Sequence, residues 1–514
     1  MKLHAKLAVL ITFIGIMGLI IWRVAEPILT ELQQAEVSDV GEKGSIHIAI
    51  DGWVGYFPLC SPEMKRRINR KGYGLRCTDD AADYRDRFKK LKSNHYQFVV
   101  ATVDSYLLNA ERYSFPGPII AVIDESKGGD AIIAKKAKYP NLEALKSGDH
   151  LSVVYTPNSP SHHLLKAVSS HFDIPLLNQL NNLIESEGSE HALSLFEQGK
   201  ADIAVVWEPE VSKALENEDT VRLLGTEDTQ QLIVDILIAS QKVAKEDPEM
   251  VNVLLREYFK TLKFYRDNPD TFVEAISDHY NIRTGTARAL LKGVGWATLS
   301  ENAERWYGIS HQSIASEALV ETIESAIDIL LKRDDFKRNP IPNQDTYVLI
   351  NSGFIAQLYK DLANVGGFSI PATNDGNGLM FAPLTNAQWE SLQEIGSLKA
   401  RKIAFASGTA DLTLEGKQQV DELVEDLKHY PNFRVEVRGH TGLRGDKFAN
   451  DQLSQARADA VIRYIETSHS IMENRYRAIG YGSSRPLVKK PGESNRAYNY
   501  RLPRVEISLV REVY

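Results

Sequence analysis

The stretch 435–461 combines residue types and spacings that suit an anion-binding site. A short segment with alternating valines predicts a strand, and a glycine-rich turn then leads into a segment with the apolar spacing of a half-buried helix. This arrangement predicts a small polar notch made by Thr441, Asn450 and Arg457. Free backbone N–H groups at a helix start and a fixed guanidinium both favour a carboxylate. We therefore expect the notch to bind a carboxylate group.

Three elements of this region, taken in order, resemble the OmpA-like peptidoglycan-binding domain. They are Gly439-His440-Thr441, the N-x-x-L-S-x-x-R-A pattern of Asn450–Ala458, and Gly480-Tyr481-Gly482. The resemblance covers about 395–510. It implies an α+β domain that binds peptidoglycan.

One position departs from the family pattern. The resemblance implies that an Asp after His-Thr holds the ammonium of diaminopimelate in the stem peptide, while an Arg holds its carboxylate. Here Arg457 is retained, but Gly442 stands in place of the Asp. Losing a charge-assisted hydrogen bond of roughly 1.5–3 kcal/mol predicts binding weaker by about one to two decades, unless Asp446 or Asp451 substitutes. We favour weakened wall binding; the alternative is a domain with a changed or lost ligand.

The apolar segment Leu7–Trp22 follows two lysines and is either a cleaved signal peptide or a retained anchor. Cleavage after Ala25 would place Arg23 where a small residue is needed. Lys6 and Arg23 can extend this short span by snorkelling. We therefore expect residues 1–25 to be a single-pass inner-membrane anchor, with the bulk of the chain in the periplasm of a Gram-negative bacterium.

The two cysteines, Cys60 and Cys77, fall in the part expected to be periplasmic. An even, minimal count in an oxidising compartment predicts one disulfide, and the alternative is a pair of free buried thiols. The net charge of −8, without a basic stripe interleaved with aromatics, argues against nucleic acid as a partner. A chain of 514 residues predicts two or three domains.

From Ser45 onwards, short apolar strands alternate with helices, which predicts a parallel α/β sheet with ligands at the carboxyl ends of its strands. The expected strands are 46–50, 75–78, 98–102, 131–134, 151–155, 203–206 and 233–239. The last of these returns to the first lobe. Two lobes joined by two crossings predict a clamshell that closes on a ligand.

Five motifs in order resemble the periplasmic substrate-binding proteins of the nitrate, taurine and sulfonate type, also called the NMT1/THI5-like group. They read D-G-W-V-G-Y, A-T-V-D, D-E-S-K-G-G-D-A-I-I-A-K, N-S-P-S-H and A-D-I-A-V-V-W-E-P. The resemblance covers about 45–300 and implies that these segments line the interlobe cleft. The ligand-binding residues carried over by position are Trp53, Thr102, Asp104, Ser126, Gly129, Asp130, Ser159, Ser161, His162, Trp207 and Glu208.

Several of these residues have a structural alternative. Gly129 can serve only as a hinge, Asp130 can cap or orient the crossing, and Trp207 can simply pack. A metal site at His162 and His163 is not expected, because adjacent helical residues point about 100° apart and no third ligand is apparent. No catalytic residue, metal or cofactor is predicted.

The remaining segments complete the domain organisation. Helices are expected at 248–268, 269–280, 284–293 and 313–332. The resemblance ends near residue 300, and a helical extension is expected over 301–365. Glycine, proline, asparagine and aspartate near its start predict a linker over 366–394 before the OmpA-like domain.

Three functional classes fit parts of the chain. An enzyme of the thiamin-precursor type lacks a catalytic constellation. A stator-like envelope anchor needs an intramembrane acid, which Leu7–Trp22 lacks. We favour a non-enzymatic binding or sensor protein that captures a small solute and docks on peptidoglycan, with a transporter or envelope complex as a further partner; a scaffold without a solute is the alternative. The family suggests a small oxyanion or sulfonate, whereas Asp104, Asp130 and Glu208 equally suit an amine or a pyrimidine.

Overall fold

The computed structural model describes residues 41–146, 151–309, 317–364, 381–399, 403–406, 408–469 and 474–512. The anchor expected at 1–25 lies outside these ranges, as does most of the expected linker. Within them, no helix combines the length and apolar character that a membrane crossing requires. The described residues form two compact units, the first reaching Val100 and including Pro116–Pro118 and Ile238–Phe272, the second containing the rest.

The first unit is built on parallel strands, as the sequence predicts. Strand β1 (Gly44–Ile50) pairs with β2 (Tyr73–Asp79) along its whole length and with the start of β3 (Phe98–Thr102). Helices α2 (Phe57–Cys60), α3 (Pro62–Asn69), α4 (Tyr84–Lys92), α10 (Gln241–Glu246) and α11 (Pro248–Asp267) accompany these strands. Ser61 caps α3 by accepting a hydrogen bond from Met64 N–H.

The predicted disulfide is confirmed. Cys60, at the end of α2, is bonded to Cys77 in β2, with the two Cα atoms 6.1 Å apart. The alternative of two free buried thiols is therefore wrong. The bond ties the first helical segment of the unit to a strand 17 residues further along the chain.

The first β-sheet is larger and more mixed than the sequence indicates. It has six strands in the order β11-β4-β10-β3-β1-β2, where β4 is Ile119–Ser126, β10 is Val234–Ala239 and β11 is Val294–Trp296. Strands β4 and β11 were not predicted, and β11 runs antiparallel to β4.

A five-stranded sheet in the second unit has the order β7-β6-β8-β5-β9. Its strands are β5 (Asp130–Lys135), β6 (Val153–Tyr155), β7 (Leu183–Glu185), β8 (Ile203–Trp207) and β9 (Thr220–Gly225). Strand β6 is parallel to β7 and β8, but β5 is antiparallel to both β8 and β9. The prediction of a parallel sheet is therefore confirmed for β6, β7 and β8 but wrong for the pairs that β5 forms with β8 and β9. Strands covered on both faces appear as continuous apolar runs, and such runs do not reveal the direction of their neighbours.

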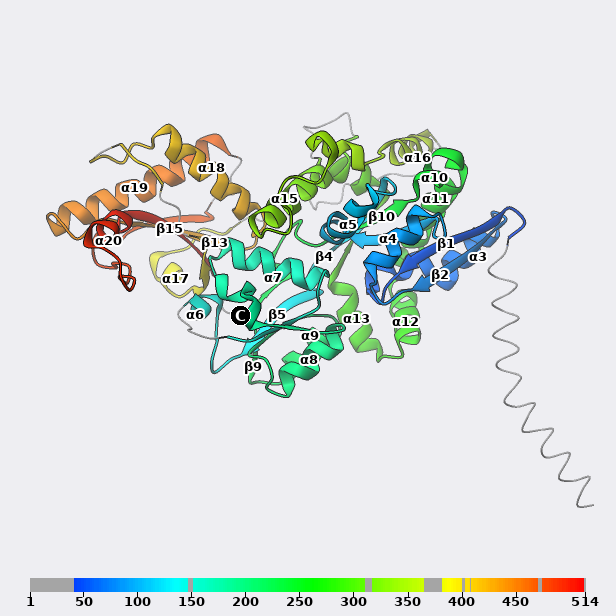
Figure 1. The fold of residues 1–514 in the computed structure, drawn as a ribbon, viewed down its shortest axis with the longest axis horizontal. Coiled ribbons are helices and arrows are strands. Elements are labelled where there is room, and N and C mark those ends of the chain that lie inside the picture. Colours follow the sequence, from blue (N-terminus) through cyan, green and yellow to red (C-terminus); the bar gives the residue numbers. More distant parts are fainter. Residues whose placement is uncertain are drawn as a thin grey trace, which may run out of the picture. The chain divides into compact units, whose positions relative to one another are not determined.

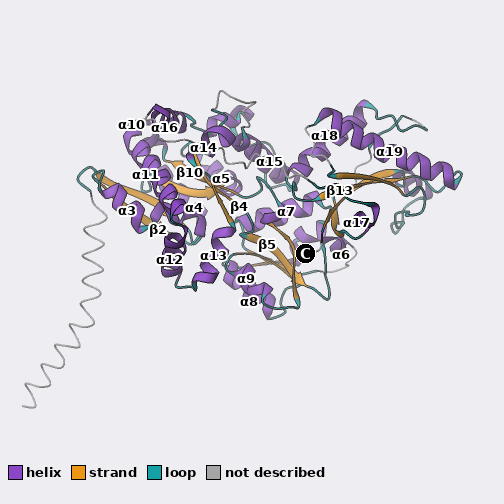
Figure 2. Ribbon diagram, turned by 180° about the vertical axis from the view of Figure 1, so that it is seen from behind, coloured by secondary structure: helices purple, strands orange, loops and turns teal. Residues whose placement is uncertain are grey.

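Helices cover both faces of this sheet (Figure 2). Ile132 and Ala134 of β5 pack in one core with α7 (Pro160–His171). Ala131 and Ile133 point into another core with α8 (Ser189–Glu197) and α9 (Glu210–Leu215). Alternate residues of a strand face opposite sides, so one apolar run supplies both cores.

Further helices follow the five-stranded sheet. They are α12 (Pro269–Tyr280), α13 (Thr284–Lys292), α14 (Leu299–Glu301), the π-helical segment Asn302–Trp306, α15 (Ala318–Lys332) and α16 (Gly353–Asn364). The first part of the helix expected at 313–332 lies outside the described residues.

The C-terminal region is a four-stranded sheet in the order β12-β15-β13-β14. The strands are β12 (Gln393–Ser397), β13 (Arg434–His440), β14 (Tyr476–Gly480) and β15 (Arg504–Arg511). Helices α18 (Leu414–Lys428) and α19 (Lys447–Ser468) lie on one face of this sheet (Figure 1). The short helices α17 (Asn386–Glu390) and α20 (Asn495–Arg501) complete the region. Strand β12 begins inside the range expected to be linker.

Within the second unit, this α+β region shares a buried core with α6 (Leu142–Lys146) and α7. His171 Nδ1 lies 2.8 Å from the hydroxyl of Tyr430, and Asn432 Nδ2 donates to Glu227 O at 2.7 Å. A Cβ added to Gly396 would lie 3.1 Å from the ring of Phe172. The α+β region is thus packed against the five-stranded-sheet lobe.

Candidate functional sites

The first candidate site is a buried carboxylate at the start of β5. Asp130 is 4% exposed, and Ser126 Oγ donates to its Oδ2 at 2.7 Å. Thr226 Oγ1 lies 2.8 Å from Ser126 Oγ and accepts hydrogen bonds from the backbone N–H of Gly128 and Asp130. The structure therefore joins the predicted Ser126 and Asp130 through Thr226. Sequence reasoning missed Thr226 because it lies 96 residues from Asp130.

The surroundings of Asp130 disfavour its ionised form. Burial is the largest cause, and the negative charges of Asp104 and Glu208 add to it, while the hydrogen bond from Ser126 acts in the opposite direction. Together they raise the pKa of Asp130 to about 7. Within the described residues, none of these three carboxylates takes part in an ion pair. The cluster therefore carries negative charge without a cationic partner.

A second polar group lies where β3 ends and α5 (Val103–Ala110) begins. Thr102 Oγ1 donates to Ser105 Oγ at 2.8 Å, and Ser105 Oγ is within 3.4 Å of Asp104 Oδ2. The same hydroxyl is 3.3 Å from the carbonyl oxygen of Asn158, in the turn before α7. Thr102 and Asp104 are thus linked to the N-S-P-S-H motif through Ser105, a residue that the sequence did not single out.

The hydroxyl groups of that motif serve the turn itself. Ser159 Oγ donates to Thr156 O at 2.6 Å and lies 3.0 Å from Ser161 Oγ. His162 packs against the ring of Tyr155 with centroids 4.5 Å apart, and its Nδ1 accepts from Asn158 N–H. Burial lowers the pKa of His162 to about 3, so the ring is neutral.

Two more predicted residues are committed to local structure. Glu208 accepts hydrogen bonds from Ser212 N–H at 3.0 Å and Ser212 Oγ at 2.7 Å, which fixes its carboxylate at the start of α9. Its own N–H donates to Gly129 O at 2.8 Å. Trp207 is half-buried, and its backbone N–H and C=O both form hydrogen bonds with Ser189 Oγ.

The remaining predicted residue, Trp53, belongs to the first unit, where its N–H donates to Asp51 Oδ1 at 3.1 Å. At the carboxyl ends of β1 and β2, a fully buried Arg87 pairs with Asp51 and Asp80 and donates to Val100 O at 2.7 Å. This arginine stabilises the strand ends in the first unit. Sequence reasoning did not single out this arginine.

The predicted notch of the C-terminal region has its three residues on connected elements. Thr441 follows β13, and its N–H donates to Gly482 O at 2.8 Å. Asn450 Nδ2 donates to Arg444 O, closing the turn before α19. Arg457, two turns further along α19, donates from Nε to Thr409 O at 3.1 Å and stacks over Phe405. Hydrogen bonds between the three side chains are absent from the described part of the chain.

Arg457 is a half-buried cation without a carboxylate partner among the described residues. Burial lowers its pKa, but the guanidinium remains charged at neutral pH. A Cβ added to Gly442 would meet only Pro503 Cγ, at 4.0 Å, so a side chain fits there. Asp446 caps α19 by accepting from Ala449 N–H at 2.9 Å. Asp451 lies beside Gly482, close to the position that a Cβ on that glycine would take.

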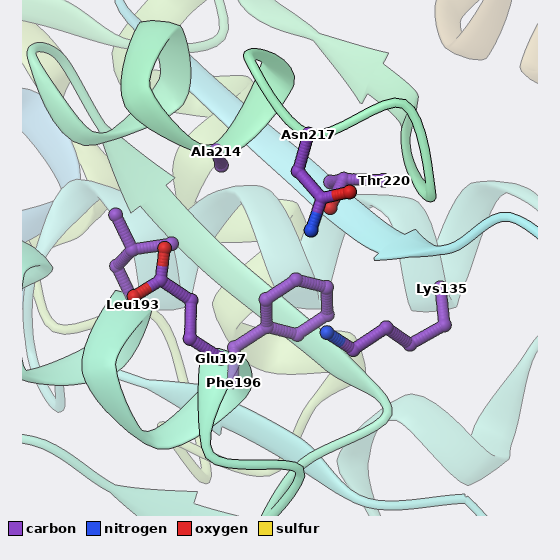
Figure 3. A pocket seen from close by; sticks show the side chains of 7 residues that line it. All are labelled: Lys135, Leu193, Phe196, Glu197, Ala214, Asn217 and Thr220. Carbon is purple, nitrogen blue, oxygen red and sulfur yellow. The ribbon is translucent and has the colours of Figure 1, made fainter.

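A pocket of about 210 Å³ lies elsewhere on the second unit (Figure 3). It is lined by Lys135, Leu193, Phe196, Glu197, Ala214, Asn217 and Thr220. Lys135 Nζ already lies 4.0 Å from the centroid of the Phe196 ring. None of the predicted ligand residues contributes to this pocket. For the chain outside the undescribed gaps, no cluster of three or more His, Cys, Asp or Glu residues could hold a metal ion.

Comparison with known proteins identifies the C-terminal region. Residues 404–500 match the model of the OmpA family. Outer membrane porin F of Pseudomonas fluorescens is 39% identical over 83 residues, which are 16% of this chain and 25% of that protein. The peptidoglycan-associated lipoprotein of Buchnera aphidicola subsp. Baizongia pistaciae is 29% identical over 103 residues, 20% of this chain and 59% of that protein. The predicted OmpA-like domain is confirmed, although the chain spans less than two thirds of either relative.

The N-terminal part is similar to sulfonate-binding proteins. The alkanesulfonate-binding protein SsuA from Xanthomonas axonopodis pv. citri is 11% identical, with a TM-score of 0.44, over 57% of this chain and 94% of that one. The periplasmic aliphatic sulphonate binding protein SsuA from Escherichia coli is 12% identical, with a TM-score of 0.44, over 57% and 89%.

Proposed function

We propose that this protein is a periplasmic binding or sensor protein, anchored in the inner membrane by residues 1–25, that holds a small solute and docks on peptidoglycan. The observation that carries the proposal concerns Arg457. This arginine occupies the motif position of an OmpA-like domain and lacks an ion-pair partner among the described residues. A half-buried guanidinium without an ion-pair partner favours a carboxylate ligand.

The wall-binding part is tested by retention on insoluble peptidoglycan. The full chain, extracted in mild detergent, is expected to sediment weakly with purified sacculi. Arg457→Ala should abolish that retention, because the notch then holds no fixed cation. Arg463→Ala removes an exposed arginine from the same helix and serves as the matched control. Equal retention of both variants would refute the role of Arg457.

For the solute, we infer a ligand with an ammonium or several N–H donors, held near Asp104 and Asp130. The reason is charge. The cluster contains carboxylates and hydroxyl groups, and within the described residues none of its carboxylates is ion-paired with a cation. A sulfonate brought there would meet negative charge, whereas an amine or an aminopyrimidine would neutralise it. This inference departs from the anion that the family resemblance suggests.

A thermal-shift screen tests the solute inference. Small amines and aminopyrimidines should raise the melting temperature of the full chain, since a ligand stabilises the state that binds it. Asp130→Asn and Trp207→Ala should each remove the rise, while the exposed Asp219→Asn should not. A rise with sulfonates alone would overturn the inferred charge of the ligand. No rise with any compound would favour an envelope scaffold without a solute.

A further inference from the structure

Two segments of the OmpA-like domain lie at the same edge of its sheet. Strands β13 and β14 run parallel and end together, with Gly439 opposite Gly480, and β15 begins beside them, with Arg504 opposite His440. The backbone hydrogen bond from Thr441 N–H to Gly482 O joins the chain segments that leave β13 and β14. Residues 441–448 and 481–503 therefore leave or return to the same edge of the sheet, and together they are called here the basic face.

The charge of this face is opposite to that of the whole chain. The two segments contain seven lysine and arginine residues and two carboxylates, in a protein whose net charge is −8. Six of the seven are exposed and, within the described part of the chain, make no ion pair: Arg444, Lys447, Arg485, Lys489, Lys490 and Arg496. The seventh, Arg501, pairs with Glu493. The second carboxylate, Asp446, caps α19.

Arg457 adds an independent observation. Its guanidinium is half-buried. Among the described residues, only its Nε makes a hydrogen bond, which it donates to Thr409 O. Partial burial of a charge without a partner costs free energy, which an anionic ligand would recover. The resemblance implies an Asp that holds the ammonium of the ligand; here Gly442 stands at that position, and a Cβ added to it would meet only Pro503 Cγ, at 4.0 Å.

Building on the wall binding proposed above, we propose that this domain recognises peptidoglycan through the carboxylates of the polymer alone. Arg457 holds one carboxylate of a stem peptide, and the basic face attracts others nearby. The free amino group of diaminopimelate is not required, because Gly442 offers it no partner. Binding then depends on the exposed cations of the basic face, and salt weakens it by screening them.

The experiment compares three forms of sacculi, with the full chain in detergent. One form is native, one has its free amino groups acetylated, and one has its carboxyl groups converted to neutral amides. Retention on acetylated sacculi should stay within about 3-fold of native, whereas amidated sacculi should lose roughly 10-fold or more. Raising the salt from about 50 to about 500 mM should also reduce retention on native sacculi.

Charge-reversal variants connect the effect to the basic face. Arg444→Glu with Lys447→Glu, or Lys489→Glu with Lys490→Glu, should each weaken retention, because all four side chains are exposed and make no ion pair among the described residues. Lys242→Glu with Lys245→Glu changes the net charge equally at exposed positions of α10 and should leave retention unchanged.

Three other outcomes would contradict the proposal in different ways. Loss of retention on acetylated sacculi would overturn it. If Asp451→Asn then also reduced retention on native sacculi, Asp451 would have taken the role of the missing aspartate. Retention on amidated sacculi would also overturn it. Failure to sediment even with native sacculi would instead refute the wall binding on which the proposal rests.

Discussion

Asp130→Asn should abolish a specific pH dependence of stability. The ordinary pKa of the carboxyl is 3.8, and burial with the nearby charges of Asp104 and Glu208 raises it to about 7 in the folded chain. Between these values the folded state binds a proton that the unfolded state has released. The free energy of unfolding therefore falls as the pH rises from about 4 to about 7, and it is level above that.

The magnitude follows from the change in pKa. A rise from 3.8 to about 7 corresponds to roughly 4 kcal/mol of stability that is present at low pH and lost by about pH 8. Asparagine keeps an oxygen that can accept the hydrogen bond from Ser126 and never ionises. The variant should thus match the wild type near pH 4 and be more stable by up to about 4 kcal/mol at pH 8. For a domain of about 150–250 residues this is an increase in melting temperature of about 8–16 °C.

Differential scanning calorimetry of both proteins between about pH 4 and about pH 8 measures the effect as a difference curve. Titrations common to both proteins cancel in that curve. Asp219→Asn, at an exposed position, should give a flat difference. In Asp104→Asn, stability should fall over a lower pH range than in the wild type, because the substitution removes one of the charges that raise the pKa of Asp130. A wild-type minus Asp130→Asn curve that is level across this range would refute the reasoning.

Three other predictions concern separate parts of the chain. Gly442→Asp should strengthen retention on native sacculi by about 10-fold to 100-fold, because the added carboxylate finds space beside Pro503 and restores a partner for the ammonium; unchanged retention would show that the notch does not face that group. Cys77→Ser should lower stability by about 3 kcal/mol, measured by denaturation of the full chain, since the closed loop no longer restricts the unfolded state; a variant as stable as the wild type would contradict this. Intact-mass analysis of protein extracted from membranes should find the residues before Ala25 retained, and a periplasmic species beginning near Glu26 would contradict the anchor.

The sequence by itself determined the elements whose signals are local. The apolar run of β3 and the helices α11 and α12, which both begin at a proline, were placed to within a residue, because periodicity and proline at a helix start act over a few neighbours. The OmpA-like domain was identified from motifs in one strand–turn–helix and from the Gly480–Gly482 segment that follows it. The disulfide followed from a count of two cysteines in a chain expected to be exported.

Tertiary structure alone decided the contacts between distant segments. The antiparallel placement of β5, the bonds of Thr226 to Asp130 and Ser126, and the burial of Arg87 against two strand ends join residues that no local pattern connects. The same holds for the packing of Tyr430 against His171, which joins the OmpA-like domain to the lobe before it. Such contacts depend on how whole elements pack, and many arrangements satisfy the same local preferences until the buried surfaces and hydrogen bonds of distant segments select one.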